Sequence, residues 1–198
     1  MNRDFHNESL FNFFLRFSRA LRRRFNGYFL LQIHVFNVDS RGPLSFDPGF
    51  RFINSKAIQL QGHNAFGLNA RIECHNSIPS IPANNTRSAK VVIGRNSTFG
   101  DNCHIGASLR VEIGDNVLIG SNVLIIDHNH GSPRSDLSSK NILPFRDRNL
   151  CSSNIVIGDC VWVCDNAKIL PGSRIGRGSI VAANAIVKGI HPEFSLIR

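Results

Sequence analysis

The sequence predicts an all-β domain folded as a β-helix of six-residue repeats. The first observation is that large aliphatic residues recur every six positions through the C-terminal part of the chain. The second is that asparagine or glycine recurs at one fixed place in these repeats, where a left-handed backbone conformation can end each short strand. The third is that the period breaks at two segments and then resumes, as expected where loops leave a regular structure.

The clearest part of the repeat runs from residue 157 to residue 187. Large aliphatic residues stand there six positions apart without a slip: Ile157, Val163, Ile169, Ile175, Val181 and Val187. A smaller residue follows four positions after each of the first five: Val161, Ala167, Ser173, Ser179 and Ala185. One large and one small inward residue in every six indicates a short strand followed by a corner, which neither a helix nor a hairpin repeats at this period.

The same period extends upstream to residue 93. The large residues are Ile93, Phe99 and Ile105. The period then shifts by two residues at Val111-Glu112 and resumes with Ile113, Ile119 and Ile125. Asparagine or glycine marks the corner of most repeats: Asn96, Asn102, Asn116, Asn122, Asn166, Gly172, Gly178 and Asn184. These twelve repeats predict four coils with three flat faces, each coil about 18 residues long and stacked ~4.8 Å from the next.

Earlier residues carry a weaker form of the repeat. The six-residue step continues at Leu60, Phe66 and Ile72. The small positions between them are Asn64, Ala70 and Asn76. A fainter version comes from Phe46, Phe52 and Ile58. We therefore expect the β-helix domain to span residues 46–198, with degenerate coils at its start.

Two interruptions of the period predict loops. Between Cys74 and Val91, the stretch 78–85 contains prolines and asparagines that are typical of a loop. After His130 the next repeat is due at residue 131 but begins at Ile157. A loop over residues 131–154 is therefore expected to project from the β-helix.

Residues 1–45 form a separate basic, phenylalanine-rich segment. Between Phe5 and Phe36, leucines and phenylalanines at partly helical spacing are mixed with arginines such as Arg16 and Arg19. Two interpretations of this short helical segment stand: an amphipathic helix on an anionic membrane surface, or a cap over the open end of the β-helix. Arginines and Asn12 interrupt the apolar run, so neither a signal peptide nor a transmembrane span is expected.

Charge and cysteine content bound the partners and the compartment. A formal charge of +9, from 23 Lys and Arg against 14 Asp and Glu, favours polyanionic partners such as anionic lipid or CoA phosphates. No nucleic-acid-binding motif accompanies the charge, so nucleic acid is not expected as a partner. Five cysteines, an odd number without a CxxC pair, favour a reducing compartment and a cytoplasmic protein.

A histidine motif, Asp127-His128-Asn129-His130, follows the last regular repeat before the projecting loop. Counted from Ile125, His128 falls on the corner and His130 just before the next inward position, so neither is expected in the core. Histidine titrates near neutral pH and can take a proton from a hydroxyl group. Asp127 is interpreted either as the carboxylate that orients an imidazole or as a cap on the turn.

The repeats and this motif together resemble the hexapeptide-repeat acyltransferases, in particular the polysaccharide and lipopolysaccharide O-acetyltransferases. The resemblance covers about residues 91–197 and rests on five segments: Ile113-Gly114-Asp115-Asn116, Ile119-Gly120-Ser121-Asn122, Asp127-His128-Asn129-His130-Gly131, Val161-Trp162-Val163 and Ile169-Leu170-Pro171-Gly172-Ser173. It implies a left-handed parallel β-helix, a homotrimer, acetyl-CoA as co-substrate between neighbouring prisms, no metal, and a saccharide acceptor that is free or lipid-linked. On a lipid-linked acceptor, the protein would work at the inner face of the membrane.

The resemblance also implies roles for single residues. His130 is the first candidate for the general base and His128 the second, with Asp127 as the orienting carboxylate. The CoA contacts map to Asp165 and Ala183 through their backbone and to Lys188 through its ammonium group, which a solvated surface lysine would also explain.

Acceptor recognition is expected from Trp162 and from the loop arginines. Trp162 is expected to line the acetyl or acceptor pocket, or else to pack between subunits. Arg134 and Arg146, with the rest of the 131–154 loop, would recognise an acidic sugar, although a charged solvated loop has the same composition.

Three alternatives remain open at this point. A sugar amine or a small molecule could replace the sugar hydroxyl as acceptor. A zinc enzyme on the same fold could use His104, His128 and His130. An inactive β-helix scaffold would need none of these residues, since a fold does not determine a function.

Overall fold

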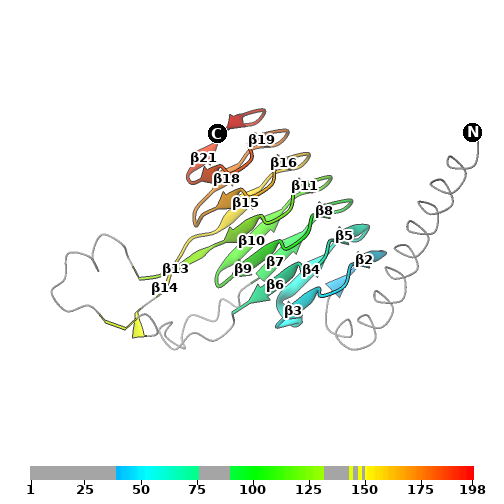
Figure 1. The fold of residues 1–198 in the computed structure, drawn as a ribbon, viewed down its shortest axis with the longest axis horizontal. Coiled ribbons are helices and arrows are strands. Elements are labelled where there is room, and N and C mark those ends of the chain that lie inside the picture. Colours follow the sequence, from blue (N-terminus) through cyan, green and yellow to red (C-terminus); the bar gives the residue numbers. More distant parts are fainter. Residues whose placement is uncertain (1–38, 76–89, 132–142, 145–146, 149) are drawn as a thin grey trace, which may run out of the picture.

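The structure is a computed structural model that describes residues 39–75, 90–131, 143–144, 147–148 and 150–198 (Figure 1). The helical segment predicted within residues 5–36 and most of the predicted loops lie outside the described residues. In the described part of the chain, no helix is long and apolar enough to cross a membrane.

Three parallel sheets form the walls of a prism. Sheet A contains, in order, β1 (Asp39–Ser40), β4 (Ile58–Leu60), β7 (Lys90–Ile93), β10 (Arg110–Ile113), β15 (Ile155–Ile157), β18 (Arg174–Ile175) and β21 (Ile190–His191). Sheet B contains β2 (Leu44–Phe46), β5 (Asn64–Phe66), β8 (Thr98–Phe99), β11 (Leu118–Ile119), β16 (Trp162–Val163), β19 (Ile180–Val181) and β22 (Leu196–Ile197). Sheet C contains β3 (Arg51–Ile53), β6 (Arg71–Cys74), β9 (His104–Ala107), β12 (Leu124–Ile126), β17 (Lys168–Ile169) and β20 (Ile186–Val187).

The chain visits the sheets in the order A, B, C, and each strand pairs with the strand one coil away. One short 3-10 helix (Ser55–Ala57) lies between β3 and β4. The predicted fold class, a left-handed parallel β-helix, is confirmed. Figure 1 shows the strands stacked as successive rungs from β2 and β3 to the C-terminal end.

The core consists of the inward residues that the six-residue period predicts. Every large residue predicted from Ile93 to Val187 is buried, and so are the small residues from Val161 to Ala185. Aligned strands stack these side chains in columns, as with Ile105, Ile125 and Ile169 in sheet C. Burial of such columns is the main source of stability in a fold whose coils contact only their neighbours.

Aromatic rings replace aliphatic side chains in the first coils. Phe46, Phe66 and Phe99 stack along sheet B with centroid distances of 5.4 Å and 4.7 Å. Phe50, which stands at the small inward position four residues after Phe46, is also buried. Phe52 is only partly buried and packs edge-on against Phe46 and Phe50.

Two kinds of residue shape the corners. The predicted asparagines all have a positive φ, as at Asn96 and Asn116, and their side chains form a ladder with Asn96 Nδ2 3.3 Å from Asn116 Oδ1. At Gly114, an added Cβ would lie 2.8 Å from the backbone nitrogen of Asp159 in the next coil. The glycine that follows many inward residues is therefore needed for close stacking of the coils.

A hairpin leaves the prism after β12. It pairs β13 (His128–His130) with the antiparallel strand β14 (Leu150–Ser152). Its base is fixed to the prism by the contact of Ser108 Oγ with Ser152 Oγ at 2.5 Å and by the Ser153 N–H, which donates to the Asp127 carbonyl. The insertion therefore starts from a defined position at the C-terminal end of β12 in sheet C.

Candidate functional site

Asp127 lies at the end of β12 and its side chain is completely buried. Oδ1 accepts a hydrogen bond from the N–H of Ser108 at 2.8 Å, and Oδ2 accepts from the N–H groups of Leu109 and Arg110, each at 2.7 Å. The carboxylate therefore binds the turn between β9 and β10. A buried charge is tolerated when hydrogen bonds satisfy it in this way.

The same carboxylate holds the imidazole of His128. His128 Nδ1 lies 2.9 Å from Asp127 Oδ1, and the side chain is 11% exposed. Because the carboxylate only accepts, Nδ1 carries the proton and Nε2 has a free lone pair when the ring is neutral. This is the arrangement of a general base oriented by a third group.

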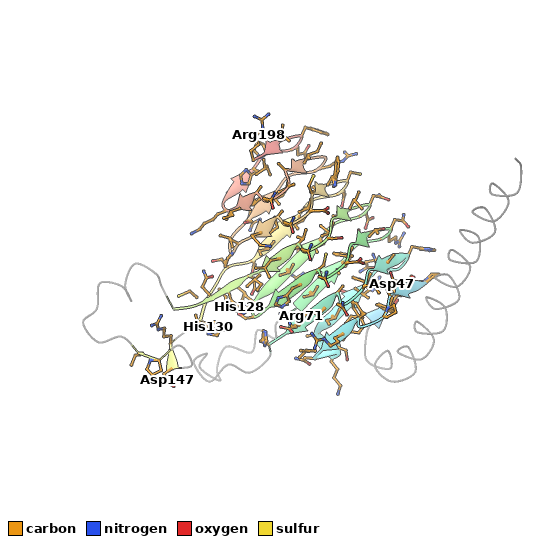
Figure 2. All side chains as sticks on the ribbon, in the orientation of Figure 1. Asp47, Arg71, His128, His130, Asp147 and Arg198 are labelled. Carbon is orange, nitrogen blue, oxygen red and sulfur yellow. The ribbon has the colours of Figure 1, made fainter. Side chains whose placement is uncertain are left out.

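His130 stands further out on β13 and is exposed. Its ring centroid is 6.4 Å from that of His128, and its neighbour across the hairpin is Leu150. Figure 2 shows both histidines where the hairpin leaves the stacked coils. The structure thus brings Asp127 together with His128, the second candidate from the sequence, and leaves His130 at a distance from that pair.

A polar cluster lies beside His128, and of its members the sequence named only His104, as a ligand in the zinc alternative. It consists of Arg71, Glu73 and His75 from β6 and its end, and His104 from β9. Arg71 donates to His104 Nδ1 at 3.0 Å, so His104 Nε2 bears the proton and donates to Glu73 Oε2 at 3.1 Å. His75 joins the cluster to His128, because the two ring centroids are 5.4 Å apart.

His104 is held in its neutral form. Burial lowers its pKa below the ordinary value of 6.5, and the Arg71 charge acts in the same direction against the opposing effect of Glu73. Both ring nitrogens are engaged by Arg71 and Glu73, which leaves none to bind zinc with His128 and His130. Among the described residues, no three His, Cys, Asp or Glu side chains are grouped to hold a metal ion.

The residues predicted for CoA lie along two corners of the prism. Asp165 and Ala183 occupy the same corner in successive coils, joined by the Asn184 N–H, which donates to the Asp165 carbonyl. The Asp165 carboxylate accepts the N–H of Ser121 at 2.7 Å and is therefore engaged in coil stacking. Lys188 is exposed just after the C-terminal end of β20. Asp127 follows the C-terminal end of β12 in the same way, and β20 and β12 are two strands apart in sheet C.

Trp162 lies on a different face of the prism from His128. It is 47% exposed on the outer face of sheet B, whereas His128 follows β12 of sheet C. In neighbouring coils it is in register with three more exposed apolar residues, Leu118, Ile180 and Leu196. Within one chain, Trp162 is thus not brought to the histidine site, and Arg134 and Arg146 lie outside the described residues.

The comparisons with known proteins agree with the fold and the repeat. The family described as "Bacterial transferase hexapeptide (six repeats)" matches residues 154–189. The predicted resemblance to hexapeptide-repeat acyltransferases is confirmed.

Two curated relatives are O-acetyltransferases by name. The chain is 47% identical over 104 residues to the "Putative lipopolysaccharide biosynthesis O-acetyl transferase WbbJ" of Escherichia coli K12, over 52% of this chain and 53% of that protein. It is 36% identical over 106 residues to the galactoside O-acetyltransferase of Escherichia coli K12, over 53% of this chain and 48% of that protein. The chain spans about half the length of the curated relatives it matches.

A solved structure shares the fold. A point mutant of AntD, an N-acyltransferase from Bacillus cereus, superimposes with a TM-score of 0.62, covering 82% of this chain and 83% of that chain. The sequence identity is 16%, so this likeness concerns the fold alone.

Proposed function

We propose that the protein is an acetyl-CoA-dependent O-acetyltransferase that transfers an acetyl group to a sugar hydroxyl of a cell-surface polysaccharide or its lipid-linked precursor. The observation that carries the proposal is the Asp127–His128 pair after the C-terminal end of β12 in sheet C. It is an oriented base on a hexapeptide-repeat prism. The names of the two O-acetyltransferase relatives support the reaction class.

In this mechanism His128 acts as the general base. Nε2 takes the proton of the acceptor hydroxyl as its oxygen attacks the thioester carbonyl of acetyl-CoA. The tetrahedral intermediate, whose oxyanion is stabilised by a backbone N–H, collapses to the acetyl ester and expels the CoA thiolate. The imidazolium returns the proton to that thiolate, so His128 ends the cycle neutral.

Asp127 would orient His128 and stabilise the imidazolium. It is well suited to this role because three backbone N–H groups fix its carboxylate independently of the histidine. His130, the first candidate from the sequence, becomes the second candidate base, and its exposure on the hairpin would instead suit contact with the acceptor.

The CoA moiety is assigned to the row of C-terminal strand ends of sheet C that continues from His128 toward the C-terminal coils. Lys188 would meet a phosphate or the pantetheine arm there, two strand spacings or roughly 10 Å from β12. Asp165 and Ala183, one corner away, would contribute through backbone atoms. Acetyl-CoA supplies the activated acetyl group, and the chain contributes the base and the orientation.

A homotrimer in the cytoplasm is the proposed working form. The exposed column of Leu118, Trp162, Ile180 and Leu196 on sheet B is an apolar surface that an assembly would bury. The five cysteines, all free in the structure, support a reducing compartment. Contact of the N-terminal segment with an anionic membrane, where a lipid-linked acceptor would be found, is part of this proposal.

The test is acetyl-CoA turnover by the purified full chain against a panel of saccharides and amino sugars, with mass spectrometry and NMR of each product. An acetyl ester on a sugar hydroxyl is expected. Acetamide formation, or no acetyl-CoA binding and no turnover, would contradict the proposal in favour of an N-acetyltransferase or a scaffold.

A further inference from the structure

The six-residue period shifts by two residues in the repeat that begins at Ile105, since the next large inward residue is Ile113. Both of these residues are buried in the core, like those of the regular repeats. The extra length forms the turn of residues 108–109 between β9 and β10, and this turn contacts the Asp127 carboxylate. The shift therefore leaves the core unchanged and adds a turn beside the Asp127–His128 pair.

The first residue of this turn, Ser108, also contacts the hairpin through its hydroxyl group. Ser108 is 2% exposed, and its Oγ lies 2.5 Å from Oγ of Ser152, which is 44 residues further along the chain. Among the described residues, Ser152 is the one hydrogen-bond partner of the Ser108 hydroxyl. Since a buried hydroxyl without a partner costs free energy, this contact holds Ser152 against the turn.

Ser152 stands directly opposite His128 in the hairpin. The two residues are paired in register between β14 and β13. A two-stranded hairpin is at best marginally stable by itself, so the position of β13 depends on what holds β14. Apart from a backbone hydrogen bond from Ser153 N–H to the Asp127 carbonyl, the described contact that holds β14 to the prism is the one between Ser152 and Ser108.

Ser108 thus supports the imidazole of His128 from two sides. Its N–H donates to Asp127 Oδ1 at 2.8 Å, the same oxygen that lies 2.9 Å from His128 Nδ1. Its hydroxyl holds Ser152, the residue opposite His128. The first route fixes the carboxylate that orients the ring, and the second fixes the strand that carries the ring. A base held in place before the reaction need not be ordered during it.

We propose that Ser108 and Ser152, here called the serine pair, are positioning residues that keep His128 in the orientation in which Nε2 meets the acceptor hydroxyl. This inference rests on the proposed function and adds two residues that act on the reaction through His128. Without the pair, β14 separates from the turn, and the imidazole spends less time in the reactive orientation.

Ser152→Ala removes one hydroxyl of the serine pair and leaves the backbone pairing intact. The value of kcat is expected to fall roughly tenfold to a hundredfold, the effect of a misplaced reacting group. The KM for acetyl-CoA is expected to stay near the wild-type value, because the residues assigned to CoA lie in later coils. Ser152→Thr keeps a hydroxyl group in a residue that favours strands, and it should restore kcat.

Ser97→Ala is the matched control for a serine that only stabilises the fold. Ser97 is completely buried, and its hydroxyl donates to the Gly114 carbonyl and accepts from the N–H of Val117 in the next coil. Its loss is expected to lower Tm and leave kcat unchanged. Equal losses of kcat in Ser97→Ala and Ser152→Ala would mean that the serine pair has no specific effect on His128, and would overturn the inference.

A double-mutant cycle tests whether the two serines act as a pair. The cycle compares kcat of Ser108→Ala, of Ser152→Ala and of the variant with both changes. The double variant is expected to be no slower than the slower single variant, because either change alone already breaks the contact. Additive losses would show that the two hydroxyls act separately, and would overturn the inference.

Chemical labelling reports on His128 without any turnover. Diethyl pyrocarbonate modifies neutral imidazole nitrogens, and peptide mass spectrometry gives the rate at each histidine of the full chain. In the wild type His128, whose side chain is 11% exposed, is expected to react more slowly than the exposed His63, which serves as the internal reference. Ser152→Ala should raise the rate at His128 several-fold and leave the rate at His63 unchanged.

This labelling separates failure of the inference from failure of the proposed function. If the wild type acetylates sugars while Ser152→Ala keeps the wild-type kcat and the wild-type labelling rate at His128, the proposed function stands and the role of the serine pair is wrong. If the wild type acetylates no sugar but Ser152→Ala still raises the labelling rate at His128, the proposed function fails and the serine pair is confirmed as the support of this imidazole.

Discussion

Sheet C contains two regions with the same core and different outer surfaces. From β6 to β20 the inward column is buried: Ile72, Ile105, Ile125, Ile169 and Val187. The outward column beside it contains Arg71 and His104 in the central coils and ends with Lys168 and Ile186 in the C-terminal coils. The core does not require these outer residues, and the histidine cluster lies where the repeat is interrupted by the hairpin.

The regular six-residue repeats therefore form the scaffold, and the candidate site lies where the repeat is interrupted. Where coils continue, as after β17, a corner is a short turn. Where the coil is interrupted after β12, a buried carboxylate fixes both the turn before β10 and the first histidine of the hairpin. Most of the following changes alter one region and spare the other, and Asp127→Asn alters both.

The largest effect is expected from His128→Ala. Loss of a general base lowers kcat by a factor on the order of 10²–10⁴, while the outward position leaves the core intact. Steady-state acetyl transfer and thermal unfolding measure the two effects. His63→Asn, an exposed histidine with a left-handed φ that asparagine tolerates, is the control and should keep wild-type activity.

A core substitution should show the reverse pattern. Ile169→Ala removes a fully buried side chain and is expected to lower the free energy of unfolding by about 2–5 kcal/mol. Ile186→Ala, 69% exposed on the same sheet, should stay within about 0.5 kcal/mol of the wild type. Chemical denaturation of both variants checks the comparison, and equal losses would mean that the inward and outward assignments are wrong.

Asp127→Asn should damage both regions at once. The amide nitrogen cannot accept, so at least one of the three backbone N–H groups loses its partner, at a cost of about 1–3 kcal/mol in unfolding free energy. Acetyl transfer should fall as well, because His128 loses its orienting carboxylate. Asp165→Asn is the matched control, since its carboxylate accepts one backbone N–H in an exposed corner and should cost less than about 1 kcal/mol. A variant with wild-type stability would contradict the structural role of Asp127.

The smallest effect concerns the pH dependence of stability through His104. Its pKa is lowered by burial in the folded chain, so the unfolded chain binds a proton more readily below the ordinary value of 6.5. The unfolding free energy that depends on neutral His104 is therefore present above 6.5 and lost as the pH falls through the lowered pKa. His104→Gln should flatten that part of the profile, and wild-type and variant profiles of the same slope would exclude the effect.

The scaffold was largely predictable from the sequence because its signals are local. The step from Ile157 to Val187 fixes the inward residues, and Asn96 or Asn116 marks a corner without knowledge of any distant contact. The pattern departs from expectation at Phe50, a large buried residue at a small inward position, and at Cys160, which takes a left-handed φ of 56° in place of asparagine.

The site was less predictable because it depends on register between coils. Glu73 meets His104 across 31 residues, and Asp127 reaches the N–H groups of residues 108–110 in the previous coil. The resemblance ranks His130 ahead of His128, and a count within one repeat cannot show which imidazole the carboxylate touches.

The assignment of His128 as the general base is tested most directly by comparing two variants, His130→Ala and His128→Ala. The quantity measured is the ratio of their acetyl-transfer efficiencies, kcat/KM, with acetyl-CoA and a neutral glycoside. His130→Ala is expected to retain most of the wild-type activity and to exceed His128→Ala by roughly 10²-fold or more. A ratio near or below one would contradict the assignment of the Asp127–His128 pair as the reacting centre.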